Sequence, residues 1–411
     1  MSGGAPAIDP VGVAADVAAL VRVPSVTGRE RAALTWLAER AERLGLEAEL
    51  VEHDLAALRA HPDHPGEEAE RTELLTLAVT LRGSLPGRVC LNGHVDVVAP
   101  GTVPWRHGPW SGAIEDGFVH GRGSVDMKGG VVAALHALAA LRAAATPTPE
   151  VVLQCVPSEE DGGLGTFAAL ERDRRFDACL IPEPTGFDVI CAQAGALTFR
   201  GTVHGRAAHA ALRLEGRSAI DRYVPVHAAL AEHERHINAA VGHPAMRSLA
   251  LPYPLSVGRL GAGEWSSSVP DRLEFEGRVG VRVGEDPAAA RAAFEAAVRA
   301  AAAEDPPVEI AWTGGAFAPG ETDPAHPWVV RVLDAVRSER GTAAPAGAPW
   351  GADMRLYCAR GIPACMVGTR GIELAHAVDE RVRIDDLAAL ARIIAAVVSA
   401  GVVEAPANGE H

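Results

Sequence analysis

The sequence predicts an α/β protein in which a mainly parallel sheet is interrupted by a separate α+β insert. With 411 residues, 48% of them hydrophobic, the chain is long enough for about two folded domains. Nearly continuous apolar runs, such as residues 88–98, are typical of strands that are buried on both faces of a parallel sheet. Between residues 195 and 315 the pattern changes to a compact strand–helix–strand–strand–helix–strand order.

Composition restricts the classes of partner and the compartment. Fifty-three acidic against 38 basic residues give a formal net charge of -15, which disfavours a nucleic-acid or anionic-membrane partner and favours cations. The six cysteines have no Cys-x-x-Cys spacing, so we expect reduced core thiols in a cytoplasmic protein. No signal peptide is expected, because no positive segment precedes an apolar core near residue 1. The most hydrophobic run, 393–403, is too short to span a bilayer and predicts a buried helix.

The first part of the chain predicts two helices and two strands. Helical spacing of apolar residues places amphipathic helices at 10–23 and 28–44. A weak strand at 47–51 and a stronger one at 74–81 follow. The charged loop between them, 61–71, is expected to be solvated.

The apolar run 88–98 ends in polar residues. His94 and Asp96 are two positions apart, so they share one face of an extended segment, and the Asp96 carboxylate could hold the His94 imidazole in one tautomer. A satisfied structural histidine is the alternative. A loop and hairpin, 101–120, follow this strand.

The glycine-rich stretch 121–130 carries a single carboxylate, Asp126, immediately before an apolar helical pattern that begins at Val131. Glycines on both sides of Asp126 allow positive φ and a close approach of the backbone to a ligand. Asp126 is therefore either a helix cap or a ligand.

Two further buried strands also end in acids. The strand 151–157 leads into residues 159–161, which are Glu-Glu-Asp, and the strand 177–181 leads into Glu183. Adjacent buried acids are costly unless a cation neutralises them, although an acidic helix N-terminus is the other reading. Open α/β sheets bind ligands beyond the carboxyl ends of their strands.

The insert separates two parts of one core. After it, the sheet pattern resumes with a helix at 327–340, a strand at 364–368 and a closing helix at 384–400. We therefore expect a discontinuous domain formed by residues 1–194 and 316–411, with the insert at 195–315. The elements of the insert are expected at 196–204, 218–237, 253–260, 272–283, 287–302 and 308–313.

Five motifs in this order resemble the M20-type dinuclear zinc amidohydrolases. That family includes acetylornithine deacetylase, succinyl-diaminopimelate desuccinylase, aminoacylase and carboxypeptidase G. The resemblance runs from about Val13 to about Val403, and it implies a zinc-peptidase-like catalytic domain and a ferredoxin-like lid and dimerisation domain. The motifs are Leu91-Asn-Gly-His94-Val-Asp96, Gly121-Arg-Gly-Ser-Val-Asp126-Met-Lys-Gly-Gly, Ser158-Glu159-Glu160, Pro182-Glu183-Pro184 and Ala375-His376-Ala-Val-Asp-Glu380.

The resemblance implies a ligand set for two divalent metal ions per chain, zinc first and cobalt or manganese as alternatives. Asp126 would bridge both ions. His94 and Glu183 would complete one site, and Glu160 and His376 the other. Oxygen and imidazole ligands suit Zn²⁺, and a shared carboxylate can hold two cations about 3.5–4 Å apart.

Three residues are expected to have catalytic roles, Glu159 and His209 from the resemblance and Asp96 from its position two residues after His94. Glu159 would be the general base acting on a metal-activated water, and Asp96 would orient His94. In the insert, Gly205-Arg-Ala-Ala-His209 resembles the Gly-x-x-x-His motif of the family's lid. His209 would then stabilise the tetrahedral oxyanion, in the active site of the partner subunit of a homodimer.

The implied reaction is amide hydrolysis of a small N-acyl amino acid or amine. A dipeptidase or carboxypeptidase shares every metal motif, and resemblance to a thiamine-precursor deformylase keeps an N-formyl aminopyrimidine substrate open. A non-catalytic binding dimer is the remaining class. Arg278, Arg355 and Arg370 could each clamp a substrate carboxylate or form a structural salt bridge.

Overall fold

A computed structural model describes residues 7–302 and 306–399 of the chain, which form two compact units. Unit 1 consists of the described residues that fall within Met1–Cys191, Glu321–Ala346 and Leu356–His411. Unit 2 is drawn from Ala192–Gly320 and Gly347–Arg355. The boundaries expected for the insert, 195 and 315, lie close to the two ends of the longer segment of unit 2, Ala192 and Gly320. The short segment 347–355 also belongs to that unit.

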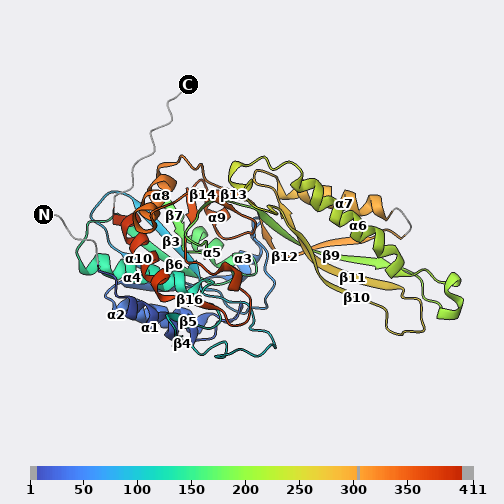
Figure 1. Cartoon of the computed structure of the whole chain (residues 1–411), viewed down its shortest axis with the longest axis horizontal. Coiled ribbons are helices and arrows are strands. Elements are labelled where there is room, and N and C mark those ends of the chain that lie inside the picture. The colour runs from blue at the N-terminus through green and yellow to red at the C-terminus, as the bar shows by residue number, and fades with distance from the viewer. Residues whose placement is uncertain (1–6, 303–305, 400–411) are drawn as a thin grey trace, which may run out of the picture. The chain divides into compact units, whose positions relative to one another are not determined.

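A large sheet confirms the predicted α/β class (Figure 1). The central strands β6, β3, β7 and β15 are parallel, whereas β1 with β2, β2 with β6 and β15 with β8 are antiparallel. The parallel strands are the apolar runs of the sequence, and they are buried along nearly their whole length. In spatial order the strands are β1 (Glu47–Glu52), β2 (Leu75–Leu81), β6 (Glu150–Val156), β3 (Arg88–His94), β7 (Ala178–Ile181), β15 (Ala364–Met366), β8 (Val189–Gln193) and β13 (Gly320–Glu321), with β14 (Pro345–Ala348) paired to β8.

The helices outside the insert pack into the same core. The closing helix α10 (Ile384–Ser399) is largely buried and contacts α1, α4 and α8, so both ends of the chain contribute to one hydrophobic core. Its predicted last residue, Ala400, lies outside the described residues. Elements that the sequence did not predict include helices α3 (Leu55–Arg59) and α5 (Leu164–Arg172) and strands β8 and β14. The other helices are α1 (Pro10–Val21), α2 (Arg31–Arg43), α3 (Leu55–Arg59), α4 (Lys128–Ala143), α5 (Leu164–Arg172), α8 (Pro327–Arg340) and α9 (Met354–Cys358).

The described part of the chain contains no helix of the length and apolarity needed to cross a membrane.

The charged loop 61–71 differs from its prediction at its end. Arg71 is buried with 6% exposure, instead of lying in solvent. Its guanidinium is 3.1 Å from Asp161, 3.4 Å from Glu67 and 3.6 Å from Glu30. A buried arginine is tolerated where carboxylates surround it, and such partners cannot be read from the local sequence.

The insert has the predicted βαββαβ order. Its sheet is antiparallel, with the spatial order β10, β11, β9 and β12. Short 3₁₀ turns, η1 (Ala210–Glu215) and η2 (Pro244–Met246), lie between the elements. The elements are β9 (Gly195–His204), α6 (Ala219–Asn238), β10 (Leu255–Ala262), β11 (Arg272–Val281), α7 (Pro287–Ala301) and β12 (Glu309–Phe317).

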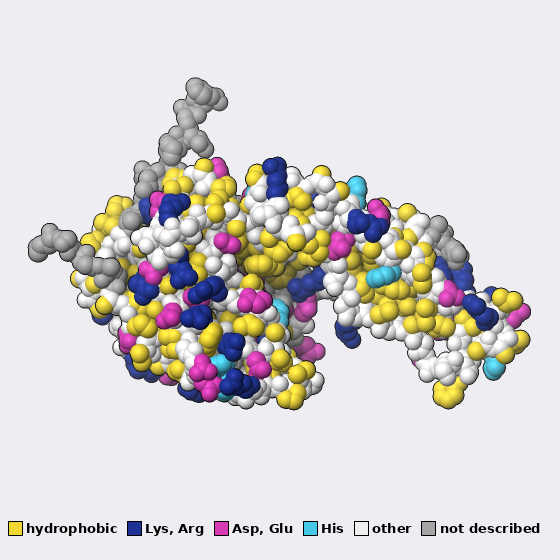
Figure 2. Space-filling view, viewed as in Figure 1, with side chains coloured by type: hydrophobic (Ala, Val, Ile, Leu, Met, Phe, Trp, Pro, Cys, Tyr) yellow, Lys and Arg dark blue, Asp and Glu magenta, His cyan; other side chains and the backbone are white. Residues whose placement is uncertain are grey.

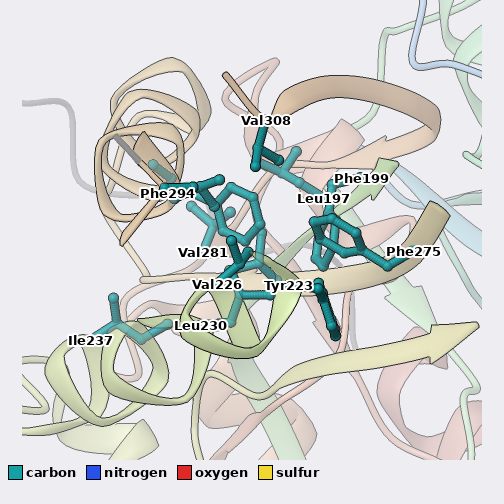
Figure 3. Packing of buried hydrophobic residues seen from close by; sticks show 14 of the residues in the cluster. Leu197, Phe199, Tyr223, Val226, Leu230, Ile237, Phe275, Val281, Phe294 and Val308 are labelled. Carbon is teal, nitrogen blue, oxygen red and sulfur yellow. The ribbon is translucent and has the colours of Figure 1, made fainter. Parts of the chain in front are cut away.

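An aromatic cluster fills the core of unit 2 (Figure 3). The Phe199 ring lies 4.6 Å from the Phe294 ring and 6.0 Å from the Phe275 ring, measured between centroids. Phe275 pairs across the sheet with Gly201, where a side chain would collide with its ring. Gly201 therefore gives the aromatic cluster its space.

A small sheet in unit 1 consists of β16 (Arg381–Arg383), β5 (Phe118–His120) and β4 (Ala113–Glu115), in that spatial order. Strands β4 and β5 form the hairpin expected within 101–120. The 3₁₀ turn η3 (Ile372–Leu374) precedes the segment that carries His376.

Candidate metal centre

The carboxyl ends of β3, β6 and β7 lie at one edge of the large sheet, because these strands are parallel neighbours. His94 is the last residue of β3 and is paired with Val156, the last residue of β6. The acids 159–160 follow β6 closely, and Glu183 follows β7. The parallel topology thus brings together ligand-type residues from distant parts of the sequence.

Asp126 lies between two histidines. Its Oδ1 is 3.1 Å from His94 Nε2, and its Oδ2 is 3.3 Å from His376 Nε2. The Asp126 side chain is only 13% exposed, and the peptide bond between Asp126 and Met127 is cis. Each carboxylate oxygen therefore faces a different imidazole.

Two more acids extend this arrangement in opposite directions. Glu183 Oε1 lies 3.7 Å from His94 Nε2, and Glu160 Oε2 lies 3.0 Å from His376 Nε2. Ligand atoms of His94, Asp126 and Glu160 all lie within 4.8 Å of one another. The residues form two donor sets that share Asp126, and oxygen and imidazole donors at these separations fit a pair of divalent cations.

Glu159 faces the donor set that contains His94. Its Oε2 is 4.0 Å from His94 Nε2, and the residue is 8% exposed. Glu160, the next residue, faces the other histidine. Glu159 and Glu160 lie in the turn after β6, and their side chains point toward different histidines.

Asp96 is buried at the centre, but the atom that holds His94 differs from the prediction. The backbone carbonyl of Asp96 accepts a hydrogen bond from His94 Nδ1 at 2.9 Å, whereas its carboxylate is 3.6 Å from this nitrogen. The carboxylate instead accepts the amide N–H groups of Glu159 and Glu160, each at 3.2 Å, and the Thr27 hydroxyl at 3.1 Å. Asp96 therefore orients the two glutamates directly and the histidine through its main chain.

The ionisable groups of the centre perturb one another strongly. Burial lowers the pKa of His94, but hydrogen bonding to Asp126 and the nearby carboxylates raise it well above the ordinary value. Hydrogen bonds to Asp126 and Glu160 raise the pKa of His376 to about 10. Burial raises the pKa of Asp126, but its bonds to both imidazoles hold it below the ordinary range. Burial raises the pKa of Asp96 to about 8. Clustering of this kind is typical of functional sites.

Glu380 fixes the loop that presents Asp126, a role that the sequence did not suggest. Its carboxylate accepts the amide N–H groups of Gly123, Val125 and Asp126 at 3.0, 2.9 and 3.2 Å. Arg122 donates to Glu380 at 2.7 Å and to the His376 carbonyl at 3.2 Å. Glu380 is the last residue of the sequence motif that contains His376. Its role could not be predicted, because hydrogen bonds to main-chain amides do not depend on a recognisable residue pattern.

The third acid after β6, Asp161, has a structural environment. It pairs with Arg71, accepts the Ser158 hydroxyl and accepts the amide of Ala69 at 2.8 Å. Arg370 likewise forms a bidentate ion pair with buried Asp386, in which Nε is 2.9 Å from Oδ2 and Nη2 is 2.6 Å from Oδ1. In each case an arginine supplies the charge opposite to that of the buried acid.

The remaining sequence candidates belong to unit 2. His209 is exposed and precedes η1, where its Nδ1 accepts the Ala211 amide at 3.1 Å. Arg355 is buried, donates to the Ala352 carbonyl at 3.0 Å and lies 4.3 Å from the Phe317 ring. Arg278 lies 5.8 Å from the same ring. The substrate-clamp reading of these arginines stays a prediction.

Comparison with known sequences gives a family and named relatives. The sequence profile of Peptidase family M20/M25/M40 matches residues 90–400. A succinyl-diaminopimelate desuccinylase from Methylorubrum extorquens is 38% identical over 206 residues, which cover 47% of this chain and 50% of the relative. The chain thus spans about half the length of that relative in this match. A second desuccinylase, from Methylobacterium sp. (strain 4-46), is 29% identical over 95% of this chain and 96% of its own length.

Comparison with solved structures supports the fold. The M20 family metallo-carboxypeptidase Sso-CP2 from Sulfolobus solfataricus superposes with a TM-score of 0.74. The match covers 94% of this chain and 98% of that chain at 17% sequence identity. This likeness concerns the architecture of the chain.

Proposed function

The chain belongs to peptidase family M20/M25/M40, and from this membership we propose that it is a metal-dependent hydrolase that removes an N-acyl group from a small amino acid or amine. The names of both desuccinylase relatives favour an N-succinyl substrate. The overall charge of -15 argues against nucleic acid as the substrate.

The position of Asp126 between two imidazoles carries this proposal. Its two oxygens lie 3.1 and 3.3 Å from His94 Nε2 and His376 Nε2, which is the arrangement that a bridging carboxylate needs. Glu183 and Glu160 supply the further oxygen donors of the two sets. We propose zinc in both sites, with cobalt and manganese as alternatives, because histidine and carboxylate donors accept all three.

Divalent cations bound there would polarise the substrate carbonyl and lower the pKa of a water molecule. Glu159 is the proposed general base: it takes the proton from the attacking water and delivers it to the leaving amine nitrogen. The Asp96 carboxylate fixes the backbone of Glu159 through the 3.2 Å hydrogen bond, so the base is oriented before substrate arrives.

Unit 2 is the proposed lid and dimerisation domain, with His209 as the donor to the developing oxyanion in a partner's active site. Hydrophobic side chains gather over the face of unit 2 that is seen in Figure 2, which suits an interface between subunits. Large exposed hydrophobic residues of this unit include Leu212, Leu214, Ile220, Val224, Leu251, Leu260 and Trp265. All six cysteines are free thiols, which supports a cytoplasmic location.

A panel of substrates tests the proposed activity. The full chain, reconstituted with zinc, is assayed with N-succinyl, N-acetyl and N-formyl compounds beside dipeptides, and a Glu159→Gln chain serves as the control for contaminating hydrolases. We expect the highest kcat/KM for an N-succinyl amino acid. Preferred cleavage of dipeptides would instead identify a peptidase, and no hydrolysis of any compound by the zinc-loaded chain would contradict the proposal.

A further inference from the structure

The β4–β5 hairpin presents two ligand-type side chains on one face. Its turn residues, Asp116 and Gly117, have φ values of 50° and 79°, as required for a two-residue turn between twisted strands. In the pairing register Glu115 lies opposite Phe118, and Ala113 lies opposite His120. Because side chains alternate between faces and paired residues share a face, Glu115 and His120 are diagonal neighbours on the same side. Ala113, the residue paired directly with His120, has a small side chain.

His107, from the loop before the hairpin, completes a cluster with these two residues. Its Nε2 is 3.1 Å from Glu115 Oε2, and its ring centroid is 4.5 Å from that of His120. One ligand atom from each of the three residues lies within 4.8 Å of the other two. The cluster shares no residue with the metal centre around Asp126.

One ring nitrogen of each histidine in this cluster has no hydrogen-bond partner in the part of the chain that the structure describes. Nε2 of His107 and Nε2 of His120 are both buried without one, and His120 as a whole is only 5% exposed. Buried polar side-chain atoms in native proteins nearly always have a partner, so each exception requires an explanation. His107 Nε2 lies close to Glu115 Oε2 but not in the geometry of a hydrogen bond, as expected for two atoms that are directed toward a third.

We propose that His107, Glu115 and His120 form an additional site for a divalent transition metal, with Zn²⁺ as the best fit. Two imidazoles and one carboxylate are a common zinc donor set. With ligand bonds of about 2.0–2.2 Å, tetrahedral coordination places ligand atoms about 3.3–3.6 Å apart, slightly more than the 3.1 Å between His107 Nε2 and Glu115 Oε2. The Glu115 side chain is 44% exposed, so a fourth ligand can be water. The ion would tie the 101–112 loop to the hairpin.

Arg106 provides the matched control, because it competes for the same carboxylate. Its Nη2 lies 3.2 Å from Glu115 Oε2, so removal of this cation should leave zinc binding unchanged or tighter. Removal of the carboxylate in Glu115→Gln should weaken zinc binding at this site at least about 100-fold, more than a residue that only supports a ligand. His120→Gln should have the same effect as Glu115→Gln.

The test counts zinc in the full-length protein after equilibration with a zinc buffer and removal of free ion. We expect wild type and Arg106→Gln to hold one zinc more per chain than Glu115→Gln and His120→Gln. This difference does not depend on the occupancy of the Asp126 centre, and hydrolysis need not be measured. Equal zinc content in wild type and Glu115→Gln would overturn the proposal, as would loss of the same zinc from Arg106→Gln.

A spectroscopic measurement distinguishes a defined site from loose surface binding. Co²⁺ replaces zinc, and the visible absorption of wild type minus that of Glu115→Gln should have the intensity of a four-coordinate site with nitrogen and oxygen ligands. A difference spectrum of a hydrated, six-coordinate ion would contradict a built site. Because Glu115 is exposed, the Glu115→Gln protein is expected to fold. This variant alone decides the test if the His120→Gln protein fails to fold.

Discussion

Replacement of Glu380 by Gln should loosen the loop that presents Asp126. Glu380 is fully buried and accepts four hydrogen bonds, from Arg122 and from the amides of Gly123, Val125 and Asp126. A glutamine has nearly the same shape but only one oxygen, and its NH₂ group would face N–H donors. The substitution therefore removes charge and acceptors while the volume stays nearly constant.

The expected cost can be worked out from these contacts. Glu380 Oε1 serves Val125 and Asp126, and Oε2 serves Arg122 and Gly123, so one glutamine oxygen can keep only one of these two pairs. Each buried donor left without an acceptor costs about 1–3 kcal/mol, which gives about 2–6 kcal/mol for two donors. Loss of the partner of a buried charge, here Arg122 with 2% exposure, costs about 3–5 kcal/mol by itself. The two ranges describe the same contacts, so we expect about 3–5 kcal/mol.

The loss of stability is measured by urea unfolding of the metal-free chain, with the unfolding transition of unit 1 as the signal. Hydrogen exchange locates it, because the amides of Gly123, Val125 and Asp126 should lose protection. Glu39→Gln is the matched control: its side chain is 60% exposed and lies 3.5 Å from the exposed Arg43, so its effect should stay within about 0.5 kcal/mol. A Glu380→Gln loss below about 1 kcal/mol, or unchanged amide protection, would refute the reasoning.

Four other predictions address the centre, the lid and the core. Asp126→Ala should empty both metal sites by elemental analysis, whereas His94→Ala should preferentially weaken one; full occupancy of the Asp126 variant would exclude a bridging role. Glu159→Gln should keep its metals but lower kcat by about 10²–10⁴-fold in steady-state assays, and near-normal turnover would exclude the base. His209→Ala should be nearly inactive alone and regain activity when its subunits exchange with Glu159→Gln subunits; no recovery after confirmed exchange would place His209 outside the partner's site. Burial raises the pKa of Asp16, but its hydrogen bonds to His136 and Arg40 hold that pKa below 3.8. The stability that these contacts give the folded state is therefore present above pH 3.8 and is lost as the pH falls through the lower pKa of the folded state. Asp16→Asn should therefore cost about 1–3 kcal/mol in unfolding experiments at pH 7 and progressively less as the pH falls below 3.8, and a cost independent of pH would contradict the ion pair.

Sequence patterns anticipated the parts of the molecule that depend on periodicity. The apolar runs placed β3, β6 and β7, and the residues that end them, including His94 and Glu183, lie where parallel strands bring them together. The resemblance to a family identified His376 as a ligand. No residue pattern near residue 94 could have shown that His376 lies at the same edge of the sheet. Asp161 shows the limit of local reading, because its neutralising partner is Arg71, 90 positions away.

Residues held by the main chain could not be predicted in the same way. The Asp96 carboxylate bonds backbone amides instead of the imidazole two positions before it, because the turn after β6 brings those amides closer. Turn geometry of this kind depends on tertiary packing, and no spacing rule contains it.

The contribution of both chain ends to unit 1 has a consequence for biosynthesis. His376 contacts Glu160 across 216 positions, and Glu380 bonds the Asp126 amide across 254. At about 5–20 residues per second, a ribosome needs roughly 10–40 s to make the segment between Glu160 and His376. The insert is complete before that time and can form its core from contacts within itself. During this interval the nascent acids around Asp126 lack one of their histidines, so the metal centre can form only late in translation.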